Sequence, residues 1–150
     1  MNLFEKTAHE LHDMLVNKEI SAVEITKDVL SRMEVTDDKV KAYITKTADY
    51  ALQQAENVDA DIAGGAKISV LAGIPAAIKD NICTKGLKTT CASYMLENFV
   101  PPYNATVMDK VLAQKPALVG KLNMDEFAMG SSTENSHFKP TKNPFDTERI

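Results

Sequence analysis

The sequence predicts an α/β fold, and three observations predict it. Residues 70–78 are apolar on both alternating faces, a pattern typical of a strand covered on both sides of a sheet. Helix, strand and helix patterns then follow one another between Met108 and Met129. Leu, Ile, Val and Phe make up 36 of the 150 residues, about 24%, above the ~20% below which disorder dominates. We therefore expect one domain, or one part of a larger domain.

Two short helices are predicted at the start of the chain, each opened by a capping box. Residues 7–10 have the Thr-x-x-Glu form, and we expect a helix from about Ala8 to Val16. Residues 21–24 repeat this spacing as Ser-x-x-Glu, and the apolar residues that follow share one helix face. The second helix is expected to end before Asp37.

The middle of the chain predicts a strand and a long helix. Residues Tyr43–Thr45 suit a strand, and the apolar spacing of residues 48–62 predicts a third helix. Gly64 and Gly65 are typical of the end of a helix. We expect residues 1–65 to be mainly helical and residues 66–150 to begin the sheet core.

The second half of the chain predicts three further elements. Met108–Leu112 indicates a helix, and Ala117–Gly120 a buried strand. Residues 123–126 have an Asn-x-x-Glu cap that predicts another helix. After Ser136 the sequence becomes polar and is expected to form loops.

Composition and charge exclude several classes of protein. The 17 Lys and Arg residues against 21 Asp and Glu residues give a net charge of −4, which argues against nucleic-acid binding by phosphate neutralisation alone. The N-terminus has neither a signal-peptide nor a transit-peptide pattern, and residues 70–78 are too short to span a membrane. Cys83 and Cys91 make no disulfide framework or zinc spacing and are expected to be reduced. We expect a cytoplasmic protein.

Lys79 is the charged residue that ends the apolar segment 70–78. A buried lysine can become a neutral amine and act as a base, whereas a lysine at a strand end can equally reach solvent. The residue pattern leaves both readings open. His9 and His12 are spaced to share a metal, but no third ligand is evident, and we expect a solvated helix face. Residues 130–133 are small and hydroxylic, as in a plain turn or the lining of a polar ligand site.

Three longer segments carry a family resemblance that covers essentially the whole chain. They occur in the order residues 71–81 (LAGIPAAIKDN), 86–93 (GLKTTCAS) and 123–136 (NMDEFAMGSSTENS). Together they resemble the amidase signature family. The third segment is particularly similar to the glutaminase subunits of tRNA-dependent amidotransferases. The resemblance implies the amidase signature fold, a mixed β-sheet flanked by helices, of which this chain would form a truncated N-terminal part.

The resemblance also implies roles for particular residues. Lys79 matches the catalytic base of a Ser-Ser-Lys triad, and Met129, Gly130 and Ser131 match a loop that lines the substrate pocket. No metal and no cofactor is implied for this chain, because ATP and Mg would be used through a partner protein of the complex. Relatives continue past residues 143–146 into a serine-rich stretch that carries the bridging serine, followed by the nucleophilic serine and the oxyanion amides. We therefore expect residues 1–150 alone to be inactive.

The implied partners follow from the same resemblance. They are the B and C subunits of an amidotransferase, with glutamine as the substrate, tRNA bound mainly through the B subunit, and no membrane. The implied reaction supplies ammonia from glutamine for converting glutamyl-tRNA(Gln) to glutaminyl-tRNA(Gln). Two alternatives stay open: a free-standing amidase signature hydrolase of another amide, or a non-catalytic fragment that only folds or binds a partner.

Overall fold

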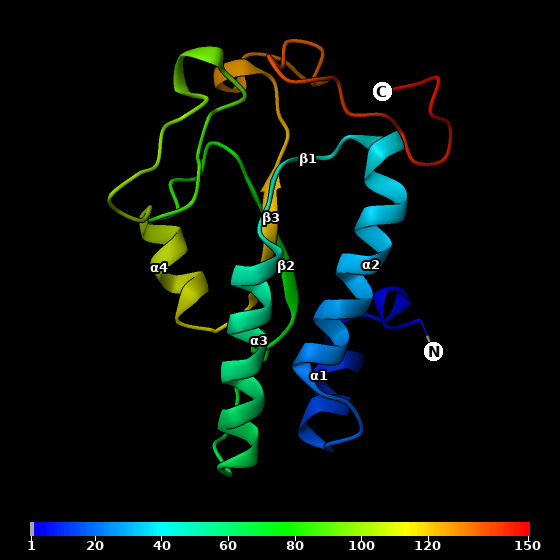
Figure 1. The fold of residues 1–150 in the computed structure, drawn as a ribbon, viewed down its shortest axis with the longest axis vertical. Coiled ribbons are helices and arrows are strands. Elements are labelled where there is room, and N and C mark those ends of the chain that lie inside the picture. Colours follow the sequence, from blue (N-terminus) through cyan, green and yellow to red (C-terminus); the bar gives the residue numbers. More distant parts are fainter. Residues whose placement is uncertain (1) are drawn as a thin grey trace. The chain divides into compact units, whose positions relative to one another are not determined.

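A computed structural model describes residues 2–150, and it has the mixed α/β architecture that the sequence predicts (Figure 1). The helices are α1 (Ala8–Val16), α2 (Ala22–Val40), α3 (Ala48–Ala63) and α4 (Thr106–Leu112). The strands are β1 (Tyr43–Lys46), β2 (Pro75–Lys79) and β3 (Ala117–Leu122). Short 3₁₀ helices occupy Leu3–Glu5, Tyr94–Leu96 and Glu126–Ala128.

The three strands form one mixed sheet in the order β1-β3-β2. β1 pairs with β3 in the antiparallel direction. β2 runs parallel to β3, since the Ile74 carbonyl accepts from Ala117 N at one end and Asp80 N donates to the Leu122 carbonyl at the other. The C-terminal end of β2, where Lys79 lies, is therefore bonded to β3.

The chain divides into two compact units, which are described separately. The first comprises residues up to Glu34, Thr47–Ala76 and Lys110–Val119, and the second comprises Val35–Lys46, Ala77–Asp109 and Gly120–Ile150. The core of the first unit is apolar and is formed by Leu3, Leu11, Leu15, Ala22, Ile25, Ala55, Val58, Ala72 and Ile74.

The first unit confirms α1 and shows how its helices are capped. The Thr7 side chain accepts from Glu10 N, and the Glu10 carboxylate accepts from Thr7 N, so the predicted capping box is formed. Asp59 of α3 accepts from the first two amides of α2, at 2.7 and 3.1 Å. This carboxylate satisfies amide donors that an α-helix leaves unpaired at its N-terminus.

The predicted strand at residues 70–78 is wrong in its first half. Residues 70–73 form a turn, and β2 begins at Pro75. Gly73 has a φ of +72°, and a Cβ added there would lie 2.6 Å from the Cβ of Ala22. Glycine is required at position 73 for two reasons: the backbone is left-handed there, and it lies too close to α2 for a Cβ.

The second helix is longer than predicted, because α2 continues through Asp37 to Val40. The Asp37 carboxylate accepts from Ala42 N at 2.8 Å and from Tyr43 N at 3.3 Å. Lys41, with a φ of +60°, takes the left-handed position after the helix that glycine usually fills. Asp37 therefore stabilises the turn into β1 instead of ending the helix.

The predicted helix after residues 123–126 is also wrong, since only the 3₁₀ turn Glu126–Ala128 forms there. Phe127 and Ala128 have φ values of +51° and +61°, which an α-helix does not allow. The predictions of β1, α3, α4, the strand at β3 and the loops after Ser136 are confirmed, with β3 two residues longer than expected.

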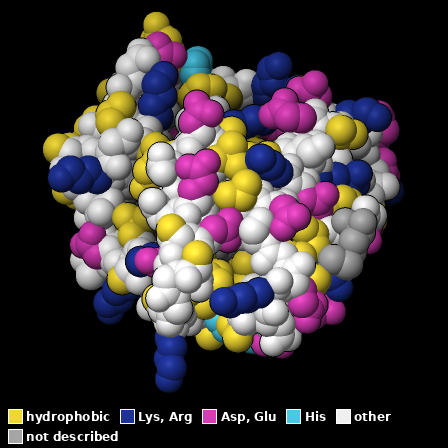
Figure 2. Space-filling view, turned by 60° about the horizontal axis from the view of Figure 1, so that its bottom comes forward, with side chains coloured by type: hydrophobic (Ala, Val, Ile, Leu, Met, Phe, Trp, Pro, Cys, Tyr) yellow, Lys and Arg dark blue, Asp and Glu magenta, His cyan; other side chains and the backbone are white. Residues whose placement is uncertain are grey.

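The surface carries charges of both signs. On the face drawn in Figure 2, Lys and Arg side chains are interspersed with Asp and Glu side chains, with hydrophobic atoms between them. Within residues 2–150, no helix is both long and apolar enough to cross a membrane.

Candidate functional site

Lys79 is the last residue of β2, and its side chain is exposed. The four residues before it in the strand are half-buried. Of the two readings that the sequence left open, this chain therefore shows the one in which the lysine reaches solvent. Its role as a base rests on the family resemblance.

The residue that follows Lys79 belongs to a buried ion pair. Asp80 Oδ1 lies 3.4 Å from the Nζ atom of Lys121 on β3, and the two side chains are 0% and 1% exposed. Asp80 Oδ2 accepts from Thr90 N at 2.8 Å and from the Thr90 hydroxyl. Burying two charges requires that each has good partners. Asp80 Oδ2 has two hydrogen bonds, whereas Oδ1 has only the ion pair with Lys121.

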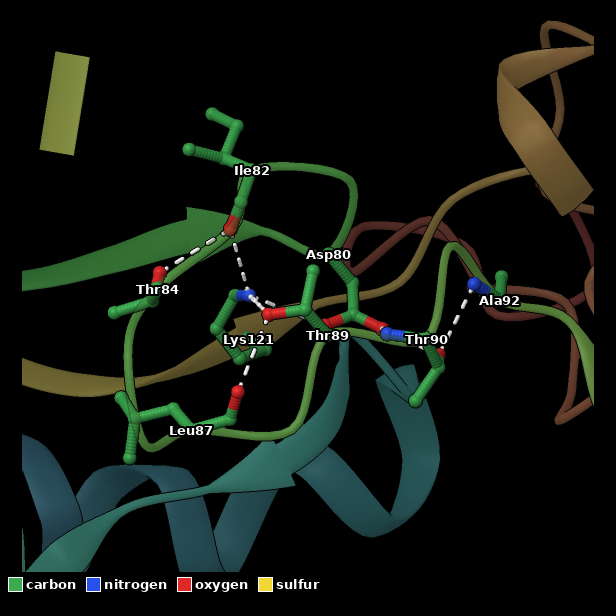
Figure 3. Close-up of polar contacts among 8 residues, drawn as sticks. All are labelled: Asp80, Ile82, Thr84, Leu87, Thr89, Thr90, Ala92 and Lys121. Carbon is green, nitrogen blue, oxygen red and sulfur yellow. Dashed lines mark hydrogen bonds and ion pairs between the residues drawn. The ribbon is translucent and has the colours of Figure 1, made fainter. Parts of the chain in front are cut away.

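Lys121 completes its hydrogen bonding within the loop that follows β2. Its ammonium donates to the Ile82 carbonyl at 3.0 Å and to Thr89 Oγ1 at 2.8 Å, in addition to its contact with Asp80 (Figure 3). The ammonium has two hydrogen-bond acceptors and one ion-pair partner. The buried Lys121 ammonium therefore contacts three residues of the segment 80–90, namely Asp80, Ile82 and Thr89.

This environment changes the pKa of two neighbouring groups. Burial lowers the pKa of Lys121 below its usual value, while the Asp80 carboxylate acts against that shift. Burial, and then the charge of Asp80, raise the pKa of the Cys91 thiol. The thiol is therefore favoured over the nucleophilic thiolate, which argues against Cys91 as a nucleophile.

Hydrogen bonds connect this buried pair to the loop at residues 126–137. The Asp80 carbonyl accepts from Cys91 N at 3.0 Å, and the Cys91 carbonyl accepts from Phe127 N at 2.9 Å. Cys91 and Phe127 both have left-handed backbones, with φ values of +51°. Such conformations are uncommon in residues other than glycine, and they cluster where surrounding contacts enforce them, often at functional sites.

The loop that carries Met129, Gly130 and Ser131 is shaped by Asp125. The Asp125 carboxylate, whose residue is 5% exposed, accepts from three backbone amides at 3.0 to 3.1 Å, those of Ser132, Thr133 and Asn135. A Cβ added at Gly130 would lie 2.5 Å from Asp125 Cγ, so only glycine fits. The backbone hydrogen bonds, led by that from Thr133, lower the pKa of Asp125.

The structure therefore brings the three predicted substrate residues into one exposed loop. Met129 is 77% exposed, and Ser131 lines a cavity of about 440 Å³ together with Thr141 and Asn143. Hydrogen bonds through Asp80 and Cys91 join the backbone beside Lys79 to this loop. Among residues 2–150, no group of three or more His, Cys, Asp or Glu residues is arranged to hold a metal ion.

Sequence reasoning missed Asp80, Lys121 and the role of Asp125. The sequence contains a signal for the first two. Lys121 stands inside the apolar run 117–122, and Asp80 comes shortly after the apolar run 70–78. Opposite charges at the ends of two buried strands can indicate a buried pair. Asp125 lies within residues 123–126, whose Asn-x-x-Glu spacing predicts a helix start, and this spacing alone does not distinguish a helix from a loop.

The chain matches known proteins along its whole length. The family model Amidase matches residues 24–150. The A subunit of a glutamyl-tRNA(Gln) amidotransferase from Heliobacterium modesticaldum is 57% identical over 150 residues, which are 100% of this chain and 31% of that protein. The chain thus spans about a third of the length of the curated relatives it matches.

Solved structures share the fold. The A subunit of the glutamyl-tRNA(Gln) amidotransferase from Thermotoga maritima is 35% identical, with a TM-score of 0.76, over 100% of this chain and 30% of that one. A bacterial aryl acylamidase of the amidase signature enzymes family is 26% identical, with a TM-score of 0.87, over 95% of this chain and 30% of that one.

Proposed function

The chain belongs to the amidase family, and from this premise we propose that it is the N-terminal part of the glutaminase subunit of a tRNA-dependent amidotransferase. The observation that carries the proposal is the 57% identity to the A subunit of a glutamyl-tRNA(Gln) amidotransferase, which extends over all 150 residues. Identity to the aryl acylamidase is 26%. The reaction is that of a glutamine-hydrolysing glutaminyl-tRNA synthase, a ligase of protein biosynthesis.

Lys79 supplies the catalytic base in this proposal. Its neutral amine takes a proton, through a bridging serine, from the serine that attacks the side-chain amide carbon of glutamine. Lys79 returns this proton to the amide nitrogen as the C–N bond breaks and ammonia leaves, and water then hydrolyses the glutamyl ester on the serine to glutamate. In relatives the bridging serine belongs to the serine-rich stretch after residues 143–146, and the nucleophilic serine follows it. The match to the amidase family supports this role, whereas burial is no argument for it, since Lys79 is exposed in this chain.

Met129, Gly130 and Ser131 contact the substrate in this proposal. Their loop is exposed, and the next two backbone amides, those of Ser132 and Thr133, donate hydrogen bonds to the Asp125 carboxylate instead of to water. A loop whose shape is fixed before binding loses less conformational entropy when the substrate arrives. The hydroxyl of Ser131 and the backbone of Gly130 are polar groups suited to an amide substrate.

The partners of the complete enzyme are part of the same proposal. The B subunit uses the ammonia on phosphorylated glutamyl-tRNA, binds most of the tRNA and uses ATP and Mg, and the small C subunit holds the complex together. This chain itself needs no cofactor for its part of the reaction. The complex is cytoplasmic.

A second candidate is a free-standing amidase that hydrolyses another amide. The TM-score of 0.87 with the aryl acylamidase, against 0.76 with the amidotransferase protein from Thermotoga maritima, favours it. Sequence identity over the whole chain outweighs this difference, because the backbone of this part is common to both groups.

The deciding experiment measures ammonia release from glutamine by the full-length protein that carries this segment, with and without the B subunit. The glutaminase proposal expects efficient release only in the assembled enzyme, with little hydrolysis of aryl amides such as anilides. Fast hydrolysis of an anilide by the isolated full-length protein, with no response to the B subunit, would favour the free-standing amidase.

A further inference from the structure

The buried pair of Asp80 and Lys121 takes no part in the chemistry described above, although it lies directly beside Lys79. We propose that this pair is the positioning element of the base, which fixes the backbone that follows Lys79 relative to β3 and to the substrate loop. The inference rests on the proposed function, because it assumes that Lys79 acts as the base.

The first support is the attachment of residue 80 to the neighbouring strand. Its backbone amide donates to the Leu122 carbonyl at 3.0 Å, and its side chain meets Lys121 Nζ at 3.4 Å. The main chain and the side chain of Asp80 are therefore both held by β3. Lys79, one residue earlier, has little freedom to shift along the strand.

The second support is the attachment of the segment that leaves the strand. Lys121 donates to the Ile82 carbonyl and to Thr89 Oγ1, and the Thr89 hydroxyl donates in turn to the Leu87 carbonyl (Figure 3). The loop after Lys79 is thus bonded to one buried cation at several points. Figure 3 shows the Lys121 amine pointing into this loop.

The third support is the continuity between the pair and the substrate loop. Asp80 holds Thr90 through its carboxylate and Cys91 through its carbonyl, and Cys91 accepts from Phe127 N at 2.9 Å. Phe127 lies two residues before Met129. Through these bonds the pair sets the backbone of the base and of the substrate loop at the same time.

Stability alone does not explain a pair of this kind. A buried ion pair is often no more stabilising than apolar side chains of similar volume. Apolar side chains, however, would make no hydrogen bonds to Ile82, Thr89 or Thr90. A base must lie within about 2.6–3.2 Å of the group it deprotonates, and a displacement of roughly 1 Å can lower the rate about 100-fold.

The test uses the full-length protein in the assembled enzyme, carrying the double substitution Asp80→Asn and Lys121→Met. Asparagine keeps the shape and an acceptor for Thr90 N, and methionine fills the volume without a charge. We expect the melting temperature to stay close to that of the parent and kcat for ammonia release to fall roughly 10- to 100-fold. The KM for glutamine is expected to change less than kcat, because the Asp125 hydrogen bonds still hold the substrate loop.

The matched control is the double substitution Asp61→Asn and Lys115→Met. It removes the ion pair of two side chains that are 34% and 57% exposed, and we expect unchanged kcat. Amide hydrogen exchange of residues 80–92 reports how firmly this backbone segment is held. The exchange should be faster in the Asp80/Lys121 variant than in the parent, and unchanged in the Asp61/Lys115 variant.

The outcomes separate the two proposals. If Lys79→Ala abolishes turnover but the Asp80/Lys121 variant keeps its kcat, positioning by the pair is overturned while the base stands. If Lys79→Ala is active, the proposed function itself fails. A kcat loss that matches the loss of folded enzyme would show a structural role and overturn the inference. If the double variant does not fold, Thr89→Val decides: lower kcat at unchanged KM supports positioning, and unchanged kcat overturns it.

Discussion

Replacing Lys121 by methionine in the 150-residue chain should destabilise it strongly. The substitution keeps most of the side-chain volume but leaves the carboxylate of Asp80, which is 0% exposed, without its cation 3.4 Å away. Removing one partner of a buried pair costs about 3–5 kcal/mol, because the remaining charge is uncompensated. Since 1 kcal/mol shifts the melting temperature of a chain of this size by about 2–4 °C, the expected fall is roughly 6–20 °C.

The assay is urea unfolding of five proteins: the parent, the single variants Asp80→Asn and Lys121→Met, their double variant, and the control Lys115→Met. The double variant should recover most of the lost free energy of unfolding, because it contains no unpaired buried charge. Lys115→Met, at a half-exposed surface pair, should cost no more than about 1 kcal/mol. The reasoning is refuted if Lys121→Met costs less than about 1 kcal/mol, or if the two single effects simply add.

Three further predictions concern other parts of the chain. Gly73→Ala should lower the free energy of unfolding by roughly 2–5 kcal/mol, because alanine is strained in the left-handed backbone conformation and its Cβ would overpack the core. Gly65→Ala, also at positive φ but with nothing within 4 Å, should cost only about 1–2 kcal/mol; equal losses in urea unfolding would contradict this. The pKa of Asp125 is lower in the folded chain than its ordinary value of 3.8. The carboxylate therefore stabilises the loop fully above pH 3.8, and this stabilisation is lost as the pH falls through the pKa of the folded chain. Hydrogen exchange of residues 130–135, corrected for its intrinsic pH dependence, should therefore speed up only at that acidic end, and an onset near neutral pH would contradict the assignment. The 150-residue chain alone should release no ammonia from glutamine, and it should bind a hydrophobic dye through exposed residues such as Met95, which is 83% exposed; ammonia release, or no dye binding, would refute the respective part.

Local signals in the sequence predicted much of the fold. The capping box at residues 7–10 defined α1 to the residue, because its hydrogen bonds involve only neighbours in the chain. The periodicity of α3 and the apolar run of β3 were equally informative. The family resemblance named Lys79 and the loop at residues 129–131, which no periodicity could have selected.

The remainder depended on contacts between distant residues. The turn at Gly73 exists because the backbone approaches Ala22, which lies 51 positions earlier in the sequence. The helix expected after residue 123 does not form because Asp125 accepts hydrogen bonds from residues seven to ten positions ahead. The burial of Lys121 depends on Asp80, 41 positions away. A pattern read along the chain does not contain these partners.

The measurement that tests the central claim most directly is glutamine-dependent ammonia release by the assembled enzyme with Lys79→Ala in its full-length glutaminase protein. We expect a loss of roughly 10²- to 10⁴-fold or more in kcat with the fold intact, because the general base is gone. Lys85→Ala, which removes another exposed lysine six residues away, should leave the rate unchanged. Near-normal ammonia release by the Lys79→Ala enzyme would contradict the account.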